Sequence, residues 1–528
     1  MRKIKKFASV LLAAALMLVL CVPAFAAGEG YTVTIIDGDV SGATYVAYKL
    51  MDVTTATTGS GTTTYAYTVN SKYSVLLRSV TGETSDEDVI SYIASLEDDD
   101  SAVRLLADKL YKAILADTTF TADAETGNEE FSGLKGYYLI AESAPGATTN
   151  AGENESYSLA ILRTVASDME ITTKESVPQL TKEVWETNDS TYSASNGEWQ
   201  DAADYDIGDS VPFRLEATIS SQYSSFTTYT LTFHDTLSSG LTFDGESSVK
   251  VYVVNNNVAT QLSTNDYTVT TSTGDSCSFH VTVTNLKNLE TNVTVTSASV
   301  VRVEYTAKLN SNAVIGQGSD STNQGNPNRA YLQYSNNPYD DSDTGKTPED
   351  KVTVFTFKLD AKKYGDSTST ELTGAGFTLY KWVATGSGAE DGSWVMVGTP
   401  QNNTSGNTFS WKGLDSGRYK IVETTVPSGY TKAEDIVFTV SATYDTDSDN
   451  PRLTAVTTSL TGGTNSVVGG EITTTVDTGT LTAGIYNKSG DSLPTTGGIG
   501  TTIFYIVGGV LVCGAAVLLI TKKRMGDD

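Results

Sequence analysis

Three polar residues in the middle of the chain occupy strand-like segments in which the residues two positions away are apolar. They are Lys182, Asp235 and Asn328. Successive side chains of a strand point to opposite faces, so residues two apart share a face. The apolar residues that share their faces are Leu180, Val184, Leu231, Phe233, Leu237, Ala330 and Leu332. We therefore expect a lysine, an aspartate and an asparagine inside one β-sandwich.

A lysine buried in this way can become a nucleophile. Taking an ammonium group out of water is costly, and the usual relief is a lowered pKa that leaves a neutral amine. That amine can attack the side-chain carbonyl carbon of an asparagine, while a protonated carboxyl group polarises the carbonyl and moves the proton. Ammonia leaves, and an amide then joins the two side chains.

The last third of the chain offers a similar set of residues. Glu423 and Asn487 each end an alternating apolar series, formed by Tyr419 and Ile421 and by Ala483 and Ile485. Lys358 is the candidate amine, because it lies in register with Val352 and Val354. The opposite face of its strand is apolar too, so the direction of its side chain stays ambiguous.

Strands must position all of these groups, and strand-like segments dominate the chain. We expect a mostly β protein built of tandem β-sandwich domains in an elongated array. The expected regions are 1–26, 27–174, 175–350, 351–488 and 489–528. The turn-rich, acidic stretch 337–350 is interpreted as the link to the third domain.

The first domain is expected to carry one or two inserted helices. Ser85 begins a capping-box-like start, and apolar residues recur at helical spacing from Val89 to Leu96. Residues 102–115 repeat that pattern. The helices would interrupt a domain that opens and closes with strands.

The first 26 residues are typical of a secretory signal peptide. A basic start is followed by an apolar core, residues 7–22, and by Ala24-Phe25-Ala26. Cleavage there would also remove Cys21.

The chain ends with a pentapeptide, an apolar run and a basic tail, which are Leu493-Pro494-Thr495-Thr496-Gly497, residues 499–520, and Lys522-Lys523-Arg524. At about 1.5 Å per residue the run can cross a hydrocarbon core of roughly 30 Å. The basic tail would stay on the cytoplasmic side. This pattern predicts a single-pass precursor with its bulk outside the cell.

The composition argues against a nucleic-acid-binding protein and against a protein braced by disulfides. With 63 acidic against 35 basic residues the formal charge is −28, and such a chain repels the phosphate backbone of nucleic acids. Processing at both ends would leave Cys277 as the only cysteine, so no disulfide could brace the mature chain. Cys277 and His280 are three residues apart, which on a strand separates their side chains. His234 points away from Asp235, so all three are interpreted as structural, and no metal or cofactor is expected.

Two motifs resemble those of a known family. Residues 417–430 resemble the E-box of Cna-B-type domains, and residues 325–338 resemble sortase-assembled major (backbone) pilins of Gram-positive bacteria. The LPxTG pentapeptide with its apolar run resembles a sortase sorting signal. The resemblance implies immunoglobulin-like domains with lysine–asparagine isopeptide bonds and an acidic catalyst. Transferred to this sequence, the lysine, the asparagine and the acidic catalyst are Lys182, Asn328 and Asp235 in the middle domain. In the last domain they are Lys358, Asn487 and Glu423.

The first domain has an E-box-like segment around Glu142, but its closing strand, 158–165, contains no asparagine. We expect no crosslink in that domain.

The resemblance also implies how subunits are joined. A sortase would attack the Thr496 carbonyl, release Gly497 and the residues after it, and pass the acyl group to a lysine of the next subunit. Lys174 stands at the place of the family's pilin-motif lysine, although no tryptophan lies upstream and no proline directly precedes it. The implied partners are a class C-like pilus sortase, a housekeeping sortase, identical subunits, minor pilins, peptidoglycan and host surface ligands.

The expected function is therefore structural: the major subunit of a covalent, wall-anchored surface pilus with a role in adhesion to host surfaces. Apart from forming its own crosslinks once, the chain is not expected to act as an enzyme. The alternative is a monomeric cell-wall-anchored adhesin or a minor pilin.

Overall fold

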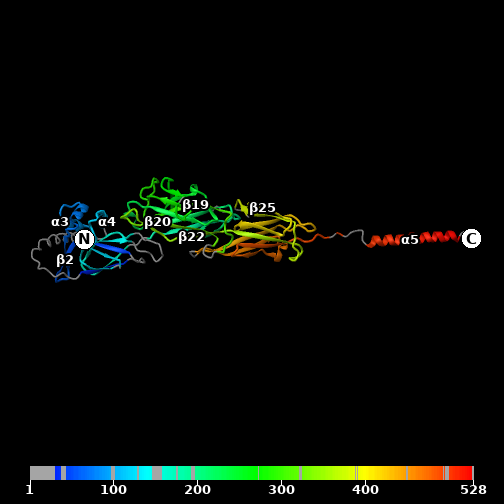
Figure 1. The fold of residues 1–528 in the computed structure, drawn as a ribbon, viewed down its shortest axis with the longest axis horizontal. Helices are drawn as coiled ribbons and strands as arrows, with labels where there is room; N and C mark the ends of the chain where they lie inside the picture. Colours follow the sequence, from blue (N-terminus) through cyan, green and yellow to red (C-terminus); the bar gives the residue numbers. More distant parts are fainter. Residues whose placement is uncertain are drawn as a thin grey trace.

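The structure is a computed structural model, and it describes residues 30–36, 43–96, 101–127, 130–144, 157–173, 177–191, 197–271, 273–319, 324–386, 388, 391–446, 450–491, 493 and 499–525. Three β-domains follow one another along the long axis, and a separate helix, α5 (Ile499–Arg524), lies at the C-terminal end (Figure 1). Each domain contains two sheets. The expected mostly β, tandem-sandwich fold is confirmed.

The first domain pairs a sheet in the order β5-β1-β8 with a sheet in the order β3-β2-β6-β7, and β4 is attached to β2. Its strands are β1 (Tyr31–Ile36), β2 (Thr44–Thr57), β3 (Thr63–Val69), β4 (Ala124–Thr126), β5 (Glu130–Leu134), β6 (Gly136–Ala144), β7 (Ile161–Val165) and β8 (Met169–Thr172). Apolar side chains from both sheets form its core.

Helices α2 (Ser74–Thr81), α3 (Asp86–Ser95) and α4 (Ser101–Leu115) lie between β3 and β4 in the sequence. The expected start of α3 is confirmed, because Ser85 Oγ accepts a hydrogen bond from the Asp88 backbone N–H at 3.1 Å. Helix α2 was not expected. It is only two turns long and has no side-chain N-cap hydrogen bond to mark its start.

The middle domain is the sandwich that must hold the first set of polar residues. One sheet runs β10-β9-β12-β19-β15-β16 with β14 on β19, and the other runs β11-β22-β20-β13-β18-β17 with β21 on β20. The strands are β9 (Leu180–Glu186), β10 (Glu198–Gln200), β11 (Ala202–Asp204), β12 (Ser210–Thr218), β13 (Leu231–Leu237), β14 (Leu241–Phe243), β15 (Lys250–Asn255), β16 (Val258–Gln261), β17 (Thr268–Thr270), β18 (Phe279–Val283), β19 (Val300–Leu309), β20 (Asn326–Ser335), β21 (Thr344–Lys346) and β22 (Asp350–Phe355).

The third domain packs a sheet β26-β23-β31-β30 on a sheet β25-β24-β27-β28-β29. Its strands are β23 (Phe357–Tyr364), β24 (Ala375–Ala384), β25 (Gly392–Asn403), β26 (Thr408–Leu414), β27 (Gly417–Thr425), β28 (Ile436–Asp445), β29 (Arg452–Gly462), β30 (Thr473–Thr475) and β31 (Thr480–Tyr486). The first and last strands, β23 and β31, are parallel neighbours.

The stretch 337–350 is not the link to the third domain, contrary to expectation. It carries β21, which pairs with β20, and it leads into β22, which also pairs with β20. The chain therefore leaves the middle domain after Phe355, and β22 belongs to the middle sandwich. Turn residues in this stretch mark a fold-back rather than a linker.

Tyr339 within this stretch fastens the middle domain to the first. Its ring meets the Tyr111 ring edge to face, with centroids 4.7 Å apart. Its hydroxyl donates to Asp108 Oδ1 at 2.8 Å and accepts the Ala160 backbone N–H at 2.8 Å. An apolar contact and two hydrogen bonds thus join domains that are far apart in sequence at these points.

Lys381 joins the middle domain to the third. Its Nζ lies 2.8 Å from Asp189, 2.8 Å from Asp206 and 2.7 Å from Asp415, and the lysine is buried. Burial alone would lower the pKa of Lys381, but the three carboxylates together raise it above its ordinary value. The lysine stays charged and neutralises acids from both domains.

Replacing this lysine should weaken the junction. Lys381→Met leaves the carboxylates facing one another without their cation, and we expect a loss of about 2–3 kcal/mol in the free energy of unfolding, because part of the cluster is exposed to solvent. Urea unfolding of the ectodomain measures this loss. Lys432→Met, at an exposed pair with Asp435, is the control and should change little. Equal effects of the two changes would contradict the junction's role.

Candidate crosslinking sites

The middle site brings together the three residues expected there. Lys182 lies on β9 of one sheet, whereas Asp235 on β13 and Asn328 on β20 lie in the other. Antiparallel pairing sets Leu237 opposite Asn328, so Asp235 is a near neighbour on the same inward face. All three side chains are 0 % exposed.

A tyrosine that the sequence reasoning missed links the three side chains. Tyr305 on β19 accepts hydrogen bonds at its hydroxyl from Lys182 Nζ at 2.9 Å and from Asn328 Nδ2 at 2.7 Å. It donates its own hydrogen to Asp235 Oδ2 at 2.7 Å. Lys182 Nζ also lies 2.6 Å from Asp235 Oδ2. The inward alternation of Val301, Val303 and Tyr305 could have signalled its burial but not its polar role.

Burial shapes the protonation of this site. It lowers the pKa of Lys182, although Asp235 opposes the shift. It raises the pKa of Asp235, although Lys182 and the Tyr305 hydroxyl oppose that shift. Both changes favour a neutral amine beside a protonated acid, which is the pairing that nucleophilic attack on an amide needs.

Two oxygens of the site lack hydrogen-bond partners within the described part of the chain: Asp235 Oδ1 and Asn328 Oδ1. A buried acceptor without a donor costs about 1–3 kcal/mol. Asp235 Oδ2 already accepts two hydrogens. A proton on Asp235 would therefore fit best on Oδ1, the oxygen that has no partner among the described residues.

The site in the third domain joins Glu423 on β27 to Asn487, just beyond β31, and both are buried. Asn487 Nδ2 donates to Glu423 Oε1 at 2.8 Å and to Oε2 at 3.1 Å, and the Ala433 backbone N–H donates to Oε2 at 2.8 Å. The carboxyl group thus contacts the amide nitrogen that would leave as ammonia. Glu423 and Asn487 lie together as expected.

Lys358 does not belong to this site, and that prediction is wrong. In the parallel pairing of β23 with β31, Lys358 lies beside Thr480, whereas Tyr364 lies beside Tyr486, the residue before Asn487. Lys358 Nζ pairs with Asp360 at 2.8 Å, and its side chain is 28 % exposed. The strand alternation from Val352 does not continue, because β22 ends and β23 begins around Thr356.

Lys363 takes the place expected for Lys358. It follows Phe357, Leu359 and Ala361 on the inward face of β23 and is fully buried. Its Nζ donates to the backbone oxygens of Tyr364 at 2.9 Å and Ile485 at 3.1 Å, and the Asn487 N–H donates to the Tyr364 oxygen at 3.0 Å. Burial lowers the pKa of Lys363 to about 8, with Glu423 opposing.

Glu142 of the first domain is buried and accepts the Ser158 backbone N–H at 2.6 Å. The small cavity beside it is lined by Ile35, Tyr45, Ile140, Ala141, Glu142, Ser158, Leu159, Ile161, Ile171 and Thr173. None of these described lining residues is a lysine or an asparagine. That the first domain forms no crosslink stays a prediction.

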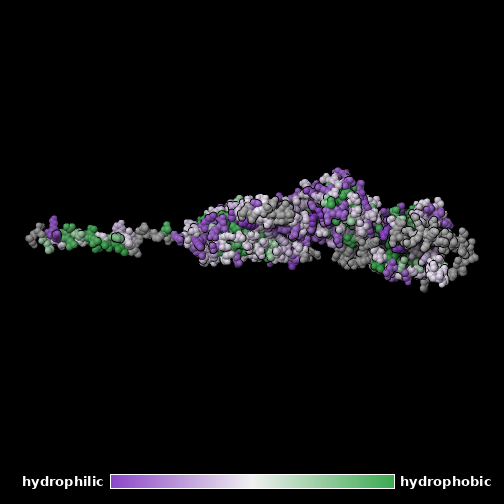
Figure 2. Space-filling view, turned by 180° about the vertical axis from the view of Figure 1, so that it is seen from behind, coloured by the Kyte–Doolittle hydropathy of each residue, from purple (hydrophilic) through white to green (hydrophobic). Residues whose placement is uncertain are grey.

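The structure describes only one of the residues expected to take part in joining subunits, Leu493. Leu493 is exposed, while Pro494, Thr495, Thr496, Gly497 and Lys174 lie outside the described residues. Helix α5 is long and apolar enough to cross a membrane from Gly500 to Arg524. Exposed apolar residues are found along the helix ahead of its basic last turn (Figure 2).

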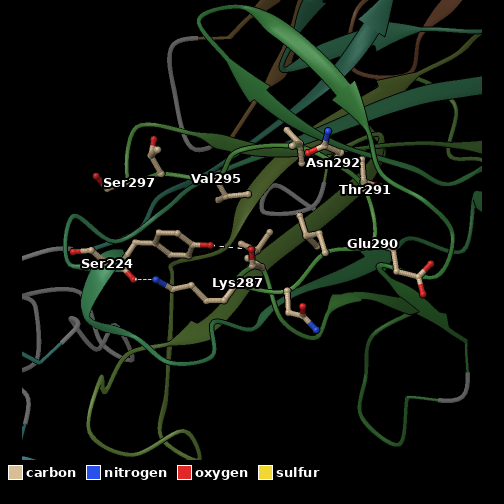
Figure 3. Close-up of a pocket in the computed structure, with 13 residues that line it drawn as sticks. Ser224, Lys287, Glu290, Thr291, Asn292, Val295 and Ser297 are labelled. Carbon is tan, nitrogen blue, oxygen red and sulfur yellow. Dashed lines mark hydrogen bonds between the residues drawn. The ribbon is translucent and has the colours of Figure 1, made fainter.

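A surface pocket of about 750 Å³ lies beside Tyr223, and its lysine, Lys287, donates to the Tyr223 backbone oxygen and lies 3.8 Å from the ring centroid (Figure 3). Lys287 is thus already engaged.

The prediction that Cys277 and His280 point apart is wrong, because Cys277 lies in the turn before β18, where strand alternation does not apply.

Three family models match the chain. Residues 207–338 match the Gram-positive pilin backbone subunit 2, Cna-B-like domain, residues 357–452 match the SpaA prealbumin-like fold domain, and residues 485–525 match the LPXTG cell wall anchor motif. The expected resemblance to wall-anchored pilins is confirmed. The anchor motif and α5 make this a cell-wall-anchored surface protein whose precursor passes through the membrane.

A curated relative and a solved structure agree with these matches. The trypsin-resistant surface T6 protein of Streptococcus pyogenes serotype M6 is 28% identical over 278 residues, which cover 42% of this chain and 48% of the relative. The chain thus spans about half the length of the curated relative it matches. The solved T6 backbone pilin of the same organism is 17% identical, covers 88% of this chain and 100% of its own, and has a TM-score of 0.50, a likeness that shows the fold.

The lowered pKa of Lys363 predicts a pH dependence of stability in a variant that cannot crosslink. Between pH 8 and about 10.5 the unfolded lysine binds a proton and the folded one does not, so the stability of Asn487→Ser should rise with pH by about 2–3 kcal/mol over this window. Urea unfolding at each pH measures the rise. Asn487→Ser with Lys363→Met is the control, and it should lack this increment. An identical pH profile in both variants would show that Lys363 titrates normally.

Proposed function

We propose that this chain, which carries the domains of a Gram-positive backbone pilin, is the major structural subunit of a covalently polymerised surface pilus. The observation that carries the proposal is the dry Lys182–Asp235–Asn328 site, placed between the two sheets of a domain that itself precedes an LPXTG anchor. A site of this kind serves a chain that must bear load, and the anchor serves a chain that a sortase attaches.

The crosslink of the middle domain forms in one turnover. Neutral Lys182 Nζ attacks Asn328 Cγ, and protonated Asp235 polarises the amide oxygen and moves a proton to the departing nitrogen. The Cγ–Nδ2 bond breaks, ammonia leaves, and a Cγ–Nζ amide remains. Tyr305 supports the step, because its hydroxyl contacts all three side chains.

The third domain follows the same chemistry with Lys363 as the amine. Glu423 contacts the amide nitrogen of Asn487 and can protonate it as it leaves. This bond would tie the first strand, β23, to the residue after the last strand, β31. Each crosslink thus joins an early strand of its domain to a late one, so tension along the chain passes through covalent bonds.

Polymerisation uses Thr496 of the sorting signal and Lys174, which lies in the sequence between the first and middle domains. A class C-like pilus sortase cleaves after Thr496 and transfers its acyl group to Lys174 of an identical subunit, and a housekeeping sortase transfers the finished fibre to peptidoglycan. Support comes from position: Lys174 lies in sequence between β8 and β9, at the junction of the first and middle domains. Minor pilins and host surface ligands would complete the fibre and its adhesive role.

The alternative is a monomeric wall-anchored adhesin or a minor pilin built from the same domains. Such a protein would accept or donate the acyl group differently from a shaft subunit.

The choice of lysine in the third domain can be tested by intact mass. The mature ectodomain should be lighter than its sequence mass by two ammonia masses. Lys363→Arg should remove one of these deficits, because the amine that attacks Asn487 is gone. Lys358→Arg, five residues away on the same strand, should keep both. Loss of the deficit in Lys358→Arg alone would overturn the assignment of Lys363.

The linkage between subunits is tested on the cell wall. Wild-type protein extracted from walls should form a ladder of high-mass bands that resist SDS, and Lys174→Arg should abolish it. Lys250→Arg, at an exposed lysine of β15, is the matched control and should leave the ladder intact. A persistent ladder in Lys174→Arg would exclude that lysine. No ladder from the wild type would favour the monomeric adhesin.

A further inference from the structure

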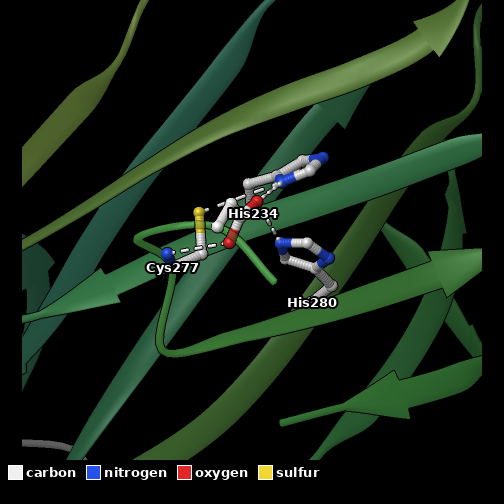
Figure 4. A group of neighbouring side chains, drawn as sticks. His234, Cys277 and His280 are labelled. Carbon is white, nitrogen blue, oxygen red and sulfur yellow. Dashed lines mark hydrogen bonds and ion pairs between the residues drawn. The ribbon is translucent and has the colours of Figure 1, made fainter. Parts of the chain in front are cut away.

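The outward face of the second sheet of the middle domain gathers four potential metal ligands. They are His234 on β13, His280 on β18, and Asp275 and Cys277 in the turn before β18 (Figure 4). One ligand atom from each lies within 4.8 Å of all the others. The chain has only two histidines, and both are in this group. So is the only cysteine that would remain in the mature chain.

Strand pairing and a tight turn bring these side chains together. His234 and His280 are direct partners across the antiparallel β13–β18 pair, with ring centroids 4.0 Å apart. Asp275 Oδ1 accepts the Cys277 backbone N–H at 2.9 Å, which stabilises the turn before β18. Asp275 Oδ2 then lies 3.1 Å from His280 Nε2 and 3.7 Å from His234 Nδ1, and Cys277 Sγ lies 3.9 Å from His234 Nδ1.

A glutamine fixes which nitrogen of His234 faces this group. Gln333 Nε2 donates to Thr344 Oγ1 at 2.9 Å, so its Oε1 is turned toward His234 Nε2, 3.2 Å away. His234 Nε2–H donates to that oxygen, which leaves the lone pair of Nδ1 directed at Asp275 and Cys277. A metal-binding histidine commonly donates its other N–H in this way to a carbonyl or carboxylate. Tyr331, stacked on the ring at 4.3 Å, holds its plane.

We propose that this cluster binds one Zn²⁺ ion through His234 Nδ1, His280 Nε2, Cys277 Sγ and Asp275 Oδ2. Tetrahedral zinc with bonds of about 2.0–2.3 Å needs ligand atoms about 3.3–3.8 Å apart. The three separations given above are 3.1, 3.7 and 3.9 Å, and all four ligand atoms lie within 4.8 Å of one another. The thiol gives its proton to solvent when it binds. The two anionic ligands then balance the charge of the metal.

The ligand chemistry selects the class of metal. Nitrogen and thiolate ligands suit zinc and its transition-metal neighbours, whereas Ca²⁺ and Mg²⁺ prefer all-oxygen sites. The acidic group at the domain junction differs in this respect, because the ammonium of Lys381 already lies among Asp189, Asp206 and Asp415. With all four positions filled by the protein, the zinc would be structural. It would pin the turn before β18 to β13, on the outer side of the strand that carries Asp235.

Titration of the metal-free ectodomain with ZnCl₂ tests the proposal. Calorimetry should give one site per chain, and CaCl₂ should give none at the same position. Cys277→Ser should weaken zinc binding by more than tenfold, and Gln333→Leu by about 10–100-fold. Asp340→Asn, in an exposed turn of the same domain, is the control and should bind as the wild type does. Unchanged zinc affinity in Cys277→Ser would overturn the proposal.

A second readout needs no variant. CoCl₂ added to the metal-free wild type should produce the absorption of a tetrahedral, thiolate-bound cobalt ion, and one equivalent of ZnCl₂ should remove it. Cobalt bound without a thiolate band would equally refute the site. Near-ultraviolet circular dichroism of each variant establishes that lost binding is not lost folding.

Discussion

The burial of a lysine amine between two apolar sheets is the constraint on which the middle domain depends. The Lys182 side chain is not exposed to solvent. Its Nζ contacts Asp235 and the Tyr305 hydroxyl and lies 5.5 Å from the centroid of the Phe213 ring. An unrelieved ion pair in such a place is a poor source of stability, because the desolvation cost rivals the attraction. The proposed amide with Asn328 would remove the lysine's charge permanently and leave Asp235 as a neutral acid. The buried Lys182–Asp235 pair thus adds little stability as an ion pair, but it is the arrangement that the proposed crosslink requires.

Covalent bracing also suits the way the domains are joined. The junctions are fixed by specific side chains, Tyr339 at one and Lys381 at the other, so force applied at one end reaches each sandwich in turn. If both ends are processed as expected, the mature chain would hold a single cysteine and no internal disulfide to resist that force. By the loop-closure argument used for disulfides, a crosslink that closes more than a hundred residues could add about 4–5 kcal/mol to stability, besides its mechanical effect.

Where strand alternation is unbroken, the sequence correctly predicts which side chains point inward. Lys182, Asp235 and Asn328 each lie within one continuous strand, so period-two spacing predicts their burial. The prediction for Lys358 extends the alternation of Val352 and Val354 past Thr356. The chain passes from one domain to the next at that point, and a new alternation begins. Cys277 was assigned as if it lay in β18, although it occupies the turn before it. Tyr305 was missed because an inward tyrosine looks like any core aromatic until its hydroxyl partners are known.

The most direct test is an electron-density map of the mature ectodomain at atomic resolution. Continuous density should join Lys182 Nζ to Asn328 Cγ at an amide bond length of about 1.33 Å, with no density for the amide nitrogen of Asn328. A gap of van der Waals width between those two atoms, with the asparagine amide intact, would contradict the claim that this protein is braced by bonds it forms itself.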